Sequence, residues 1–121
     1  MRILDSNLII YSALPAYAYL RPLLKDPDTR VSAISKLEVL GFHRLDQSSR
    51  RYFDGVFAAI PQFDIDQLVL NEAIKLRQQR KMSVGDAIIG ATALLFQLEL
   101  YTRNTTDFSW IPGLVMVNPI R

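Results

Sequence analysis

Four acidic side chains have the types and positions that divalent-cation chemistry requires: Asp5, Glu38, Asp86 and Asp107. All four follow predicted strands. Ligands bind outside the carboxyl ends of the strands in open parallel sheets, so a fold that joins these ends gathers the acids in one cleft. Basic residues close to them in the sequence are few, namely Arg2, Lys36 and Arg103, and clustered carboxylates repel each other unless a cation separates them. Ligation by oxygen alone favours Mg²⁺ or Mn²⁺.

Each of these acids also has a purely structural explanation. Asp5 can cap a following helix, and Glu38 can be the acid of a capping box that begins at Ser35. Asp86 lies in a first helical turn, where the helix dipole favours acids, and Asp107 can stabilise a turn. These structural explanations account less well for all four acids together than for any one of them. All four acids follow strands, and the helix after Asp86 is too apolar to need surface acids.

The spacing of apolar residues predicts short strands that alternate with helices. The predicted strands cover residues 2–4, 29–34, 62–65, 100–102 and 114–117. The predicted helices cover residues 8–13, 17–24, 35–41, 47–60, 67–81 and 84–98. The last of these is apolar almost all round, which predicts burial on both sides. We therefore expect an α/β fold: a single domain over residues 1–121 with a mainly parallel central sheet of four to five short strands and helices on both faces.

The composition excludes several other chemistries. The chain has no cysteine, which rules out disulfides, thiolate nucleophiles and iron–sulfur clusters. Its one histidine, His43, rules out a zinc site with two or three histidines, and we expect it to be a surface or packing residue. A net charge of +2 is weak evidence for nucleic-acid binding. No stretch reaches the roughly 18–20 apolar residues of a membrane span, and an acid at position 5 does not fit a signal peptide. We expect a cytoplasmic protein with no membrane partner.

Four segments, in order along the chain, resemble the motifs of PIN-domain ribonucleases and, among these, of the VapC toxins of bacterial type II toxin–antitoxin systems. The segments are Leu4-Asp5-Ser6-Asn7, residues 34–41, residues 85–93, and Thr102-Arg103-Asn104 with Asp107-Phe108. The resemblance spans the whole chain and implies a three-layer PIN-like fold. It also implies a metal-dependent endoribonuclease that leaves a 5′-phosphate and a 3′-hydroxyl.

The same resemblance implies roles for individual residues. The acidic quartet that holds Mg²⁺ or Mn²⁺ and carries catalysis is matched by Asp5, Glu38, Asp86 and Asp107. The three aspartates are the expected direct ligands, and Glu38 is either a further ligand or a residue that holds water on the cation. Polar positions beside the site are matched by Ser6, Thr102 and Asn104.

Basic and aromatic side chains indicate what the protein binds. Arg77, Arg80 and Lys81 cluster at the end of one predicted helix and Arg103 lies in the fourth motif, so these residues can contact RNA phosphates. The helix dipole alone also favours cations at a helix end. The tyrosine-rich run over residues 8–24 either packs in the core or leaves a groove for an antitoxin protein. That run and the apolar stripe over residues 52–60 predict a homodimer.

Two other functions stay open at this point: a catalytically inactive PIN-like module that binds RNA or protein, and a non-nuclease α/β phosphate enzyme. A haloacid-dehalogenase-type phosphatase needs a second aspartate two residues after the first, where this chain has Asn7. A phospho-accepting receiver domain needs an aspartate at the end of its third strand, whereas Asp54 lies within a predicted helix. These differences favour the nuclease, and an activity measurement separates it from an inactive module.

Overall fold

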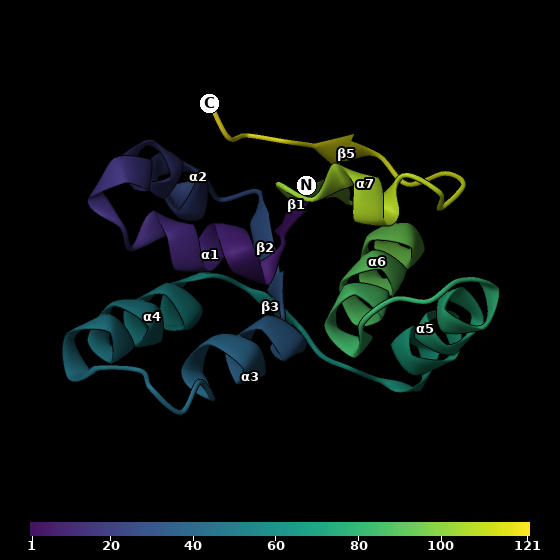
Figure 1. Ribbon diagram of the computed structural model, residues 1–121, viewed down its shortest axis with the longest axis horizontal. Coiled ribbons are helices and arrows are strands. Elements are labelled where there is room, and N and C mark those ends of the chain that lie inside the picture. The colour runs from purple at the N-terminus through teal and green to yellow at the C-terminus, as the bar shows by residue number, and fades with distance from the viewer.

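The sheet orders its strands so that the first strand lies at the centre. The computed structural model describes all 121 residues. Its strands are β1 (Arg2–Leu4), β2 (Thr29–Ser32), β3 (Gln62–Phe63), β4 (Glu99–Tyr101) and β5 (Met116–Val117). Their order across the sheet is β3-β2-β1-β4-β5, and every neighbouring pair is parallel (Figure 1). The predicted parallel α/β fold is confirmed, with five strands present.

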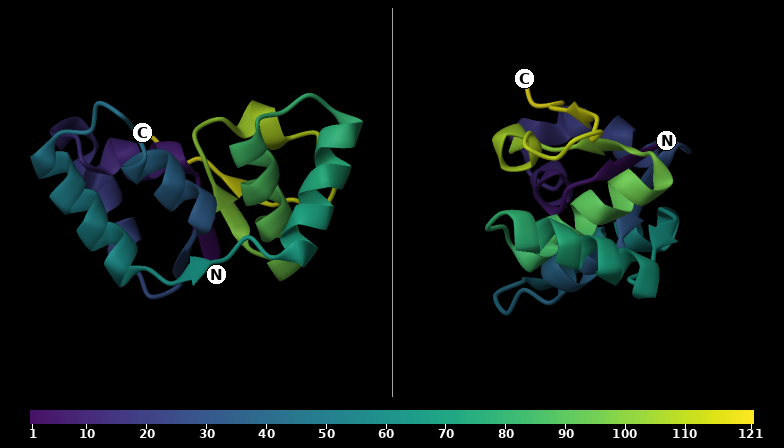
Figure 2. Two further views of the ribbon diagram at one scale, coloured as in Figure 1. Left: turned by 90° about the horizontal axis from the view of Figure 1, so that it is seen from below. Right: turned by 90° about the vertical axis from the view of Figure 1, so that its right-hand side faces the viewer.

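Helices cover both faces of the sheet. They are α1 (Ser6–Ser12), the 3₁₀ segment η1 (Pro15–Leu20), α2 (Arg21–Lys25), α3 (Ala33–Leu40), α4 (Gln47–Ala59), α5 (Gln67–Gln79), α6 (Val84–Phe96) and α7 (Thr105–Phe108). Helices α1 to α4 gather on one side of the strands and α5 to α7 on the other, as Figures 1 and 2 show. The predicted three-layer arrangement is therefore confirmed. None of the helices combines the length and the apolarity that a membrane span needs.

The chain reverses its direction across the sheet at β1. From β1 it moves to β2 and then to β3 at one edge, and later it returns through α6 to form β4 and β5 on the other side of β1. The carboxyl ends of β2, β1 and β4 consequently lie next to each other. In open α/β sheets, such a reversal point is where ligands bind.

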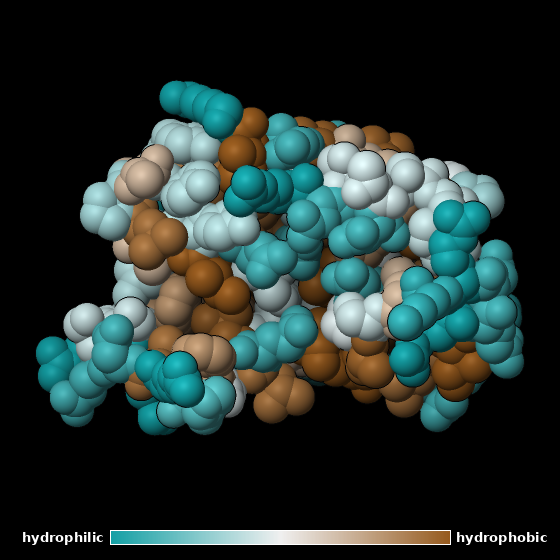
Figure 3. All heavy atoms as spheres, in the orientation of Figure 1, coloured by the Kyte–Doolittle hydropathy of each residue, from teal (hydrophilic) through white to brown (hydrophobic).

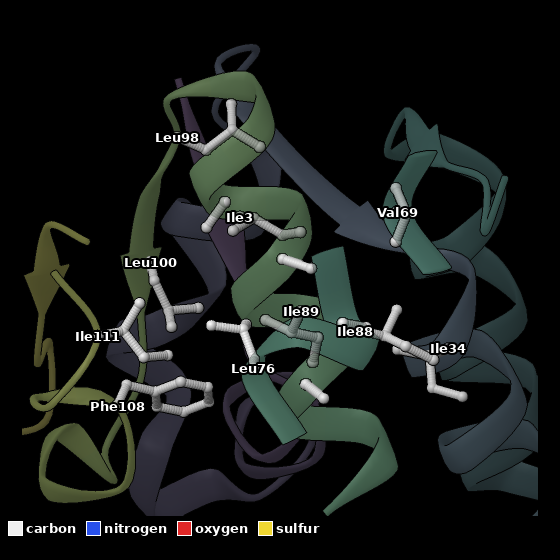
Figure 4. Close-up of a cluster of buried hydrophobic side chains, with 14 residues drawn as sticks. Ile3, Ile34, Val69, Leu76, Ile88, Ile89, Leu98, Leu100, Phe108 and Ile111 are labelled. Atoms are coloured by element: carbon white, nitrogen blue, oxygen red, sulfur yellow. The ribbon is translucent and has the colours of Figure 1, made fainter. Parts of the chain in front are cut away.

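Two apolar clusters hold the helices against the sheet. Successive side chains of a strand point to opposite faces, and Ile3 packs in one cluster while Leu4 packs in the other. On the side of α5 to α7, Ile3 shares its cluster with Ile89 of α6 and Phe108 of α7 (Figure 4). Helix α6 is buried continuously over residues 87–93, as its apolar sequence predicts.

The start of α3 differs from the prediction. Strand β2 ends at Ser32 and α3 begins at the next residue, so Ile34 is helical rather than extended. The Ser32 hydroxyl caps the helix by accepting a hydrogen bond from the backbone N–H of Ile34 at 3.1 Å. The expected capping box was therefore wrong: Ser35 is not the cap, and Glu38 lies in the second turn of α3. Its carboxylate is free for contacts with other elements.

Other elements are shorter than their sequence patterns indicated. The predicted helix over residues 17–24 divides after Leu20 into η1 and α2, and Tyr17, inside η1, has non-helical backbone angles (φ −114°, ψ 22°). Strands β3 and β5 have two residues each, and β4 ends before Thr102. Helix α6 ends at Phe96 because Gln97 adopts a left-handed conformation (φ 53°), which turns the chain towards β4.

We expect the cap of α5 to contribute measurably to stability. Asp66 accepts a hydrogen bond from the backbone N–H of Val69 at 2.9 Å. Asp66→Ala leaves that donor without its partner, and it should lower the free energy of unfolding by about 1 kcal/mol in urea denaturation. Asp64→Ala removes the same charge from an exposed position that caps no helix, so it should change stability by less than about 0.5 kcal/mol. Equal losses in the two variants would contradict the capping role.

Candidate active site

The four predicted acids converge on the carboxyl edge of the sheet. Asp5 directly follows β1, Glu38 lies in α3 after β2, and Asp107 lies in α7 after β4. Asp86 lies in the first turn of α6, the helix that leads back to β4. They therefore surround the point at which the chain reverses across the sheet. Figure 3 looks onto this face, and hydrophilic side chains gather across its middle.

Asp5 is a buried carboxylate whose partner is neutral. It is 4% exposed, and Thr102 Oγ1 donates a hydrogen bond to its Oδ2 at 2.8 Å. The backbone N–H of Asn104 donates to Thr102 Oγ1 at 3.0 Å, which orients that hydroxyl. Asp5 stands at the N-cap position of α1, but its side chain accepts no capping hydrogen bond. Burial raises the pKa of Asp5; the bond from Thr102 opposes this rise, and the charges of Glu38 and Asp107 add to it.

Glu38 is held by a serine on one side and rests against a glycine on the other. Ser6 Oγ lies 2.8 Å from Glu38 Oε1 and 2.8 Å from Ser35 Oγ. A hydroxyl has one proton to donate, so Ser6 can donate to the carboxylate while it accepts from Ser35. The other carboxylate oxygen lies over the first turn of α6, where a Cβ on Gly85 would stand 2.7 Å from Glu38 Oε2. Glycine at position 85 therefore makes room for Glu38 beside Asp86.

Asp86 and Asp107 face a cleft of about 600 Å³. The backbone N–H of Asp86 donates to the hydroxyl of Ser83, the cap of α6, at 3.1 Å. Burial raises the pKa of Asp86 to about 6; the nearby charge of Asp5 adds to this rise, as do those of Asp107 and Glu38, while a bond with Ser83 opposes it. Asp107 is exposed in α7. The negative charges of all three other acids thus add to the raised pKa of Asp86.

The four acids have no cationic partner. The three ion pairs of the structure involve Asp26, Asp54 and Glu72, so repulsion within the quartet is uncompensated. No three acidic or histidine side chains are grouped tightly enough to enclose an ion, and this spacing agrees with mutual repulsion between carboxylates. A buried carboxylate and three more acidic groups around one point provide the oxygen donors that a hard divalent cation takes.

Basic side chains line the cleft beside the acids. Arg77, Arg80 and Lys81 share the cleft with Asp86 and Asp107, so the cations at the end of α5 lie next to the predicted site. Arg103, the fourth predicted RNA contact, is not among the residues of this cleft. It is exposed, and its Nη1 donates to the hydroxyl of Tyr11 at 3.1 Å.

Sequence reasoning missed one aromatic residue in the cleft. Trp110 lies three residues after Asp107, and its Nε1 donates to the Asp107 carbonyl at 3.1 Å. The Arg80 guanidinium stands 5.3 Å from the centroid of the Trp110 ring. The position of the tryptophan one turn after an acid of the quartet was the available signal. His43, by contrast, lies on an exposed loop after α3 and contacts Phe42, as expected of a surface residue.

Solved structures of toxin–antitoxin proteins share this fold over the whole chain. A chain of a toxin–antitoxin complex from Klebsiella pneumoniae matches with a TM-score of 0.82 and 30% identity, covering 100% of this chain and 99% of its own. A chain of FitAcB from Neisseria gonorrhoeae matches with a TM-score of 0.71 and 26% identity over 98% of both chains. VapBC2 from Rickettsia felis, bound to a DNA fragment from its promoter, matches with a TM-score of 0.79 over 97% of both chains, and at 19% identity this likeness shows the fold alone. No family model and no curated protein matches the chain.

We expect the acid cluster to make the metal-free protein less stable as the pH rises. Because the folded state raises the pKa of Asp86 from 3.8 to about 6, it binds more protons than the unfolded state between these values. The free energy of unfolding therefore falls as the pH increases through this range. The loss is complete above the range and absent below it. Asp86→Asn cannot ionise, so its stability relative to the wild type should increase from about pH 4 to about pH 7 in urea denaturation with EDTA. A relative stability that is independent of pH would contradict this account, and Asp64→Asn serves as the matched control.

Proposed function

The chain belongs to the VapC-like family of PIN-domain toxins, and on this premise we propose that it is a metal-dependent endoribonuclease and the toxin of a type II toxin–antitoxin pair. One observation carries the proposal: four acidic side chains without cationic partners converge where the central strand meets its two neighbours. The toxin role is supported by 30% identity, over the full length, with a chain of a toxin–antitoxin complex.

The donor set fits Mg²⁺ or Mn²⁺, since it consists of carboxylate oxygens around a desolvated carboxyl group. Asp5, Asp86 and Asp107 are not close enough to enclose an ion in this structure; they would hold the cation directly once their side chains move together, and Glu38 would be a further ligand or orient a water molecule. When bound, such a cation stabilises the negative charge that grows on a phosphodiester during hydrolysis and lowers the pKa of the attacking water.

The remaining residues position these groups and the RNA. Thr102, oriented by the Asn104 backbone, fixes one oxygen of Asp5. Ser6 fixes one oxygen of Glu38 in the same way. Cations at the end of α5 line the cleft next to two of the acids, where they can bind backbone phosphates without reading sequence. They would also offset the repulsion between the acids and an anionic substrate.

We propose an antitoxin as the protein partner, because the similar chains come from toxin–antitoxin complexes. Figure 3 shows an apolar area over α1, α3 and α4. There Ile10 and Phe42 are exposed and line a hollow of about 220 Å³, together with Glu38. An apolar segment of the antitoxin would bury these side chains and reach the acids at the same time.

The proposed homodimer has a different surface from the one that the sequence suggested. Phe53, Phe57 and Ile60 of the stripe over residues 52–60 are buried within the chain. Apolar side chains are exposed instead on α5 and α6, where Ile74 and Val84 are about half exposed beside a groove of about 530 Å³. This groove is the surface that a second copy would cover.

We expect RNA cleavage that depends on a divalent cation and on the aspartates. The purified protein should cut a structured RNA with Mg²⁺ or Mn²⁺ and stop when EDTA is added. Asp5→Asn and Asp86→Asn nearly preserve shape but each removes a ligand charge, so each should lower the cleavage rate by more than about 100-fold. Asp64→Asn, outside the site, should cut at the wild-type rate. Cleavage that survives thorough chelation would exclude the mechanism, and RNA binding without any cleavage would identify an inactive module.

Two glycines of α6 offer a test of the position of Glu38. Gly85→Ala places a methyl group 2.7 Å from Glu38 Oε2, so the flexible carboxylate must move. We expect cleavage to slow by about 10- to 100-fold with no loss of folding stability. Gly90→Ala adds the same methyl group at 3.5 Å from Ile111 Cδ1, an ordinary contact. It should raise the free energy of unfolding by about 0.5–1 kcal/mol and leave cleavage unchanged. Wild-type cleavage by Gly85→Ala would show that the placement of Glu38 does not matter.

A further inference from the structure

A pair of buried serines stands behind the carboxylate of Glu38. Ser35 in α3 is 0% exposed, and Ser6 at the start of α1 is 7% exposed. Ser6 Oγ lies 2.8 Å from Ser35 Oγ and 2.8 Å from Glu38 Oε1. The Glu38 side chain is exposed, so the serines are the fixed end of this contact and the carboxylate is the end that is free to move without them. We call Ser35 and Ser6 the serine pair.

The hydroxyl of Ser35 has no structural task within its own helix. Ser32 caps α3. A buried hydroxyl within a helix can donate to the carbonyl four residues before it, as Thr92 does to Ile88 at 2.7 Å. Ser35 instead has one partner, Ser6 in another helix. A buried hydroxyl costs free energy unless it is hydrogen-bonded, and alanine is the better helix former. The bond to Ser6 is therefore what accounts for a hydroxyl at position 35.

The number of protons gives this bond a direction. An ionised carboxylate only accepts hydrogen bonds, so the single proton of the Ser6 hydroxyl is the one that reaches Glu38. Ser6 must then accept from Ser35 at their 2.8 Å contact. If Ser35 offers no proton, nothing prevents the Ser6 hydroxyl from turning away from Glu38. Ser35 thus decides which way the Ser6 proton points.

Asp5 is held by the same order of donors. The backbone N–H of Asn104 can only donate, and it donates to Thr102 Oγ1 at 3.0 Å. The proton of Thr102 is therefore left for Asp5 Oδ2 at 2.8 Å. In each case a group in front of the hydroxyl fixes the direction of its proton. For Glu38 that group is the Ser35 side chain, which, unlike a backbone N–H, can be removed by substitution.

From this geometry we propose that Ser35 is a positioning residue of the cation site. Its hydroxyl directs the Ser6 proton onto Glu38 Oε1 and so holds the Glu38 carboxylate beside the other acids. The proposal rests on the proposed function and adds to it a residue that touches neither the cation nor the RNA. Because Ser6 occupies Oε1, the oxygen left for the cation or its water is Oε2, which lies over Gly85. Loss of a hydrogen bond that orients a metal ligand typically costs about 10- to 100-fold in metal affinity or activity.

Mn²⁺ binding, measured by titration calorimetry, tests the proposal without RNA. Ser35→Ala should raise the dissociation constant of Mn²⁺ about tenfold, and Ser35→Thr, which keeps the hydroxyl, should restore it. Ser12→Ala is the matched control, since it removes an equally buried hydroxyl from the far end of α1. It should lower the urea midpoint of unfolding but leave Mn²⁺ affinity unchanged. Equal losses of affinity in Ser12→Ala and Ser35→Ala would overturn the proposal and leave Ser35 a packing residue.

A double-mutant cycle shows whether Ser35 acts through Glu38. Glu38→Ala removes the carboxylate that the serine pair holds, so adding Ser35→Ala to it should cause no further loss of Mn²⁺ affinity. Losses that simply add in the double variant would overturn the proposal. Ser35→Ala only removes an oxygen atom and needs no extra space, so this cycle carries the test if Ser35→Thr does not fold.

Cleavage provides a second measurement and separates this proposal from the proposed nuclease. With saturating Mn²⁺, Ser35→Ala should lower kcat by about tenfold and leave KM for RNA unchanged, because Ser35 is buried away from the substrate. A raised KM with an unchanged kcat would overturn the positioning role.

The two proposals fail in different ways. If the nuclease is wrong, the wild type cuts no RNA while its Mn²⁺ affinity still depends on Ser35 through Glu38. If the role of Ser35 is wrong, Ser35→Ala binds Mn²⁺ and cuts RNA as the wild type does. A wild-type protein that binds no Mn²⁺ would overturn both.

Discussion

A carboxylate buried at the end of a central strand needs a partner, and Asp5 has a hydroxyl where a cation would be expected. A neutral donor satisfies one oxygen but cancels no charge, and three more acids, Glu38, Asp86 and Asp107, lie within electrostatic reach. The other features of the site follow from this constraint. Ser6 holds the carboxylate of Glu38, Gly85 leaves it space, and Ser83 caps α6 so that the side chain of Asp86 is not needed for capping. The fold keeps the charges close together without neutralising them.

The apolar clusters on the two faces of the sheet supply the stabilising free energy that offsets this repulsion. Adjacent residues of β1 enter different clusters, so the strand that ends in Asp5 is anchored from both sides. Helix α6 is buried along residues 87–93 and presents Asp86 from its first turn. Burial of apolar side chains yields roughly 1.5–3 kcal/mol for each large residue, and this stabilisation lies directly behind the acids. The apolar packing behind the acids therefore offsets the electrostatic cost of holding them close together.

The sequence predicted the elements better than their boundaries. Burial of α6 was predictable because no polar face interrupts its pattern, and Asp5, Glu38 and Asp107 were predictable because each follows a strand. Asp86 instead follows helix α5 and lies in the first turn of the helix that leads back to β4. The cap of α3 was not, since Ser32 and Ser35 are chemically equivalent candidates and the choice depends on where β2 stops pairing with β3. The contact of Glu38 with Gly85 and that of Arg80 with Trp110 join segments distant in the chain. No local sequence pattern encodes these contacts, because they depend on the order of the strands in the folded sheet.

The position of β1 between β2 and β4 also sets when the site can form during synthesis. The hydrogen bond from Thr102 to Asp5 joins residues 97 positions apart, and β4, which pairs with β1, is made from the last quarter of the chain. Contacts between distant residues close late, because the loop between them must be ordered first. A nascent chain on the ribosome therefore lacks the Thr102 hydroxyl on Asp5, and Asp107, until residues 99–107 have emerged. The complete cluster is a property of the nearly finished polypeptide, and a chain truncated before β4 cannot form it.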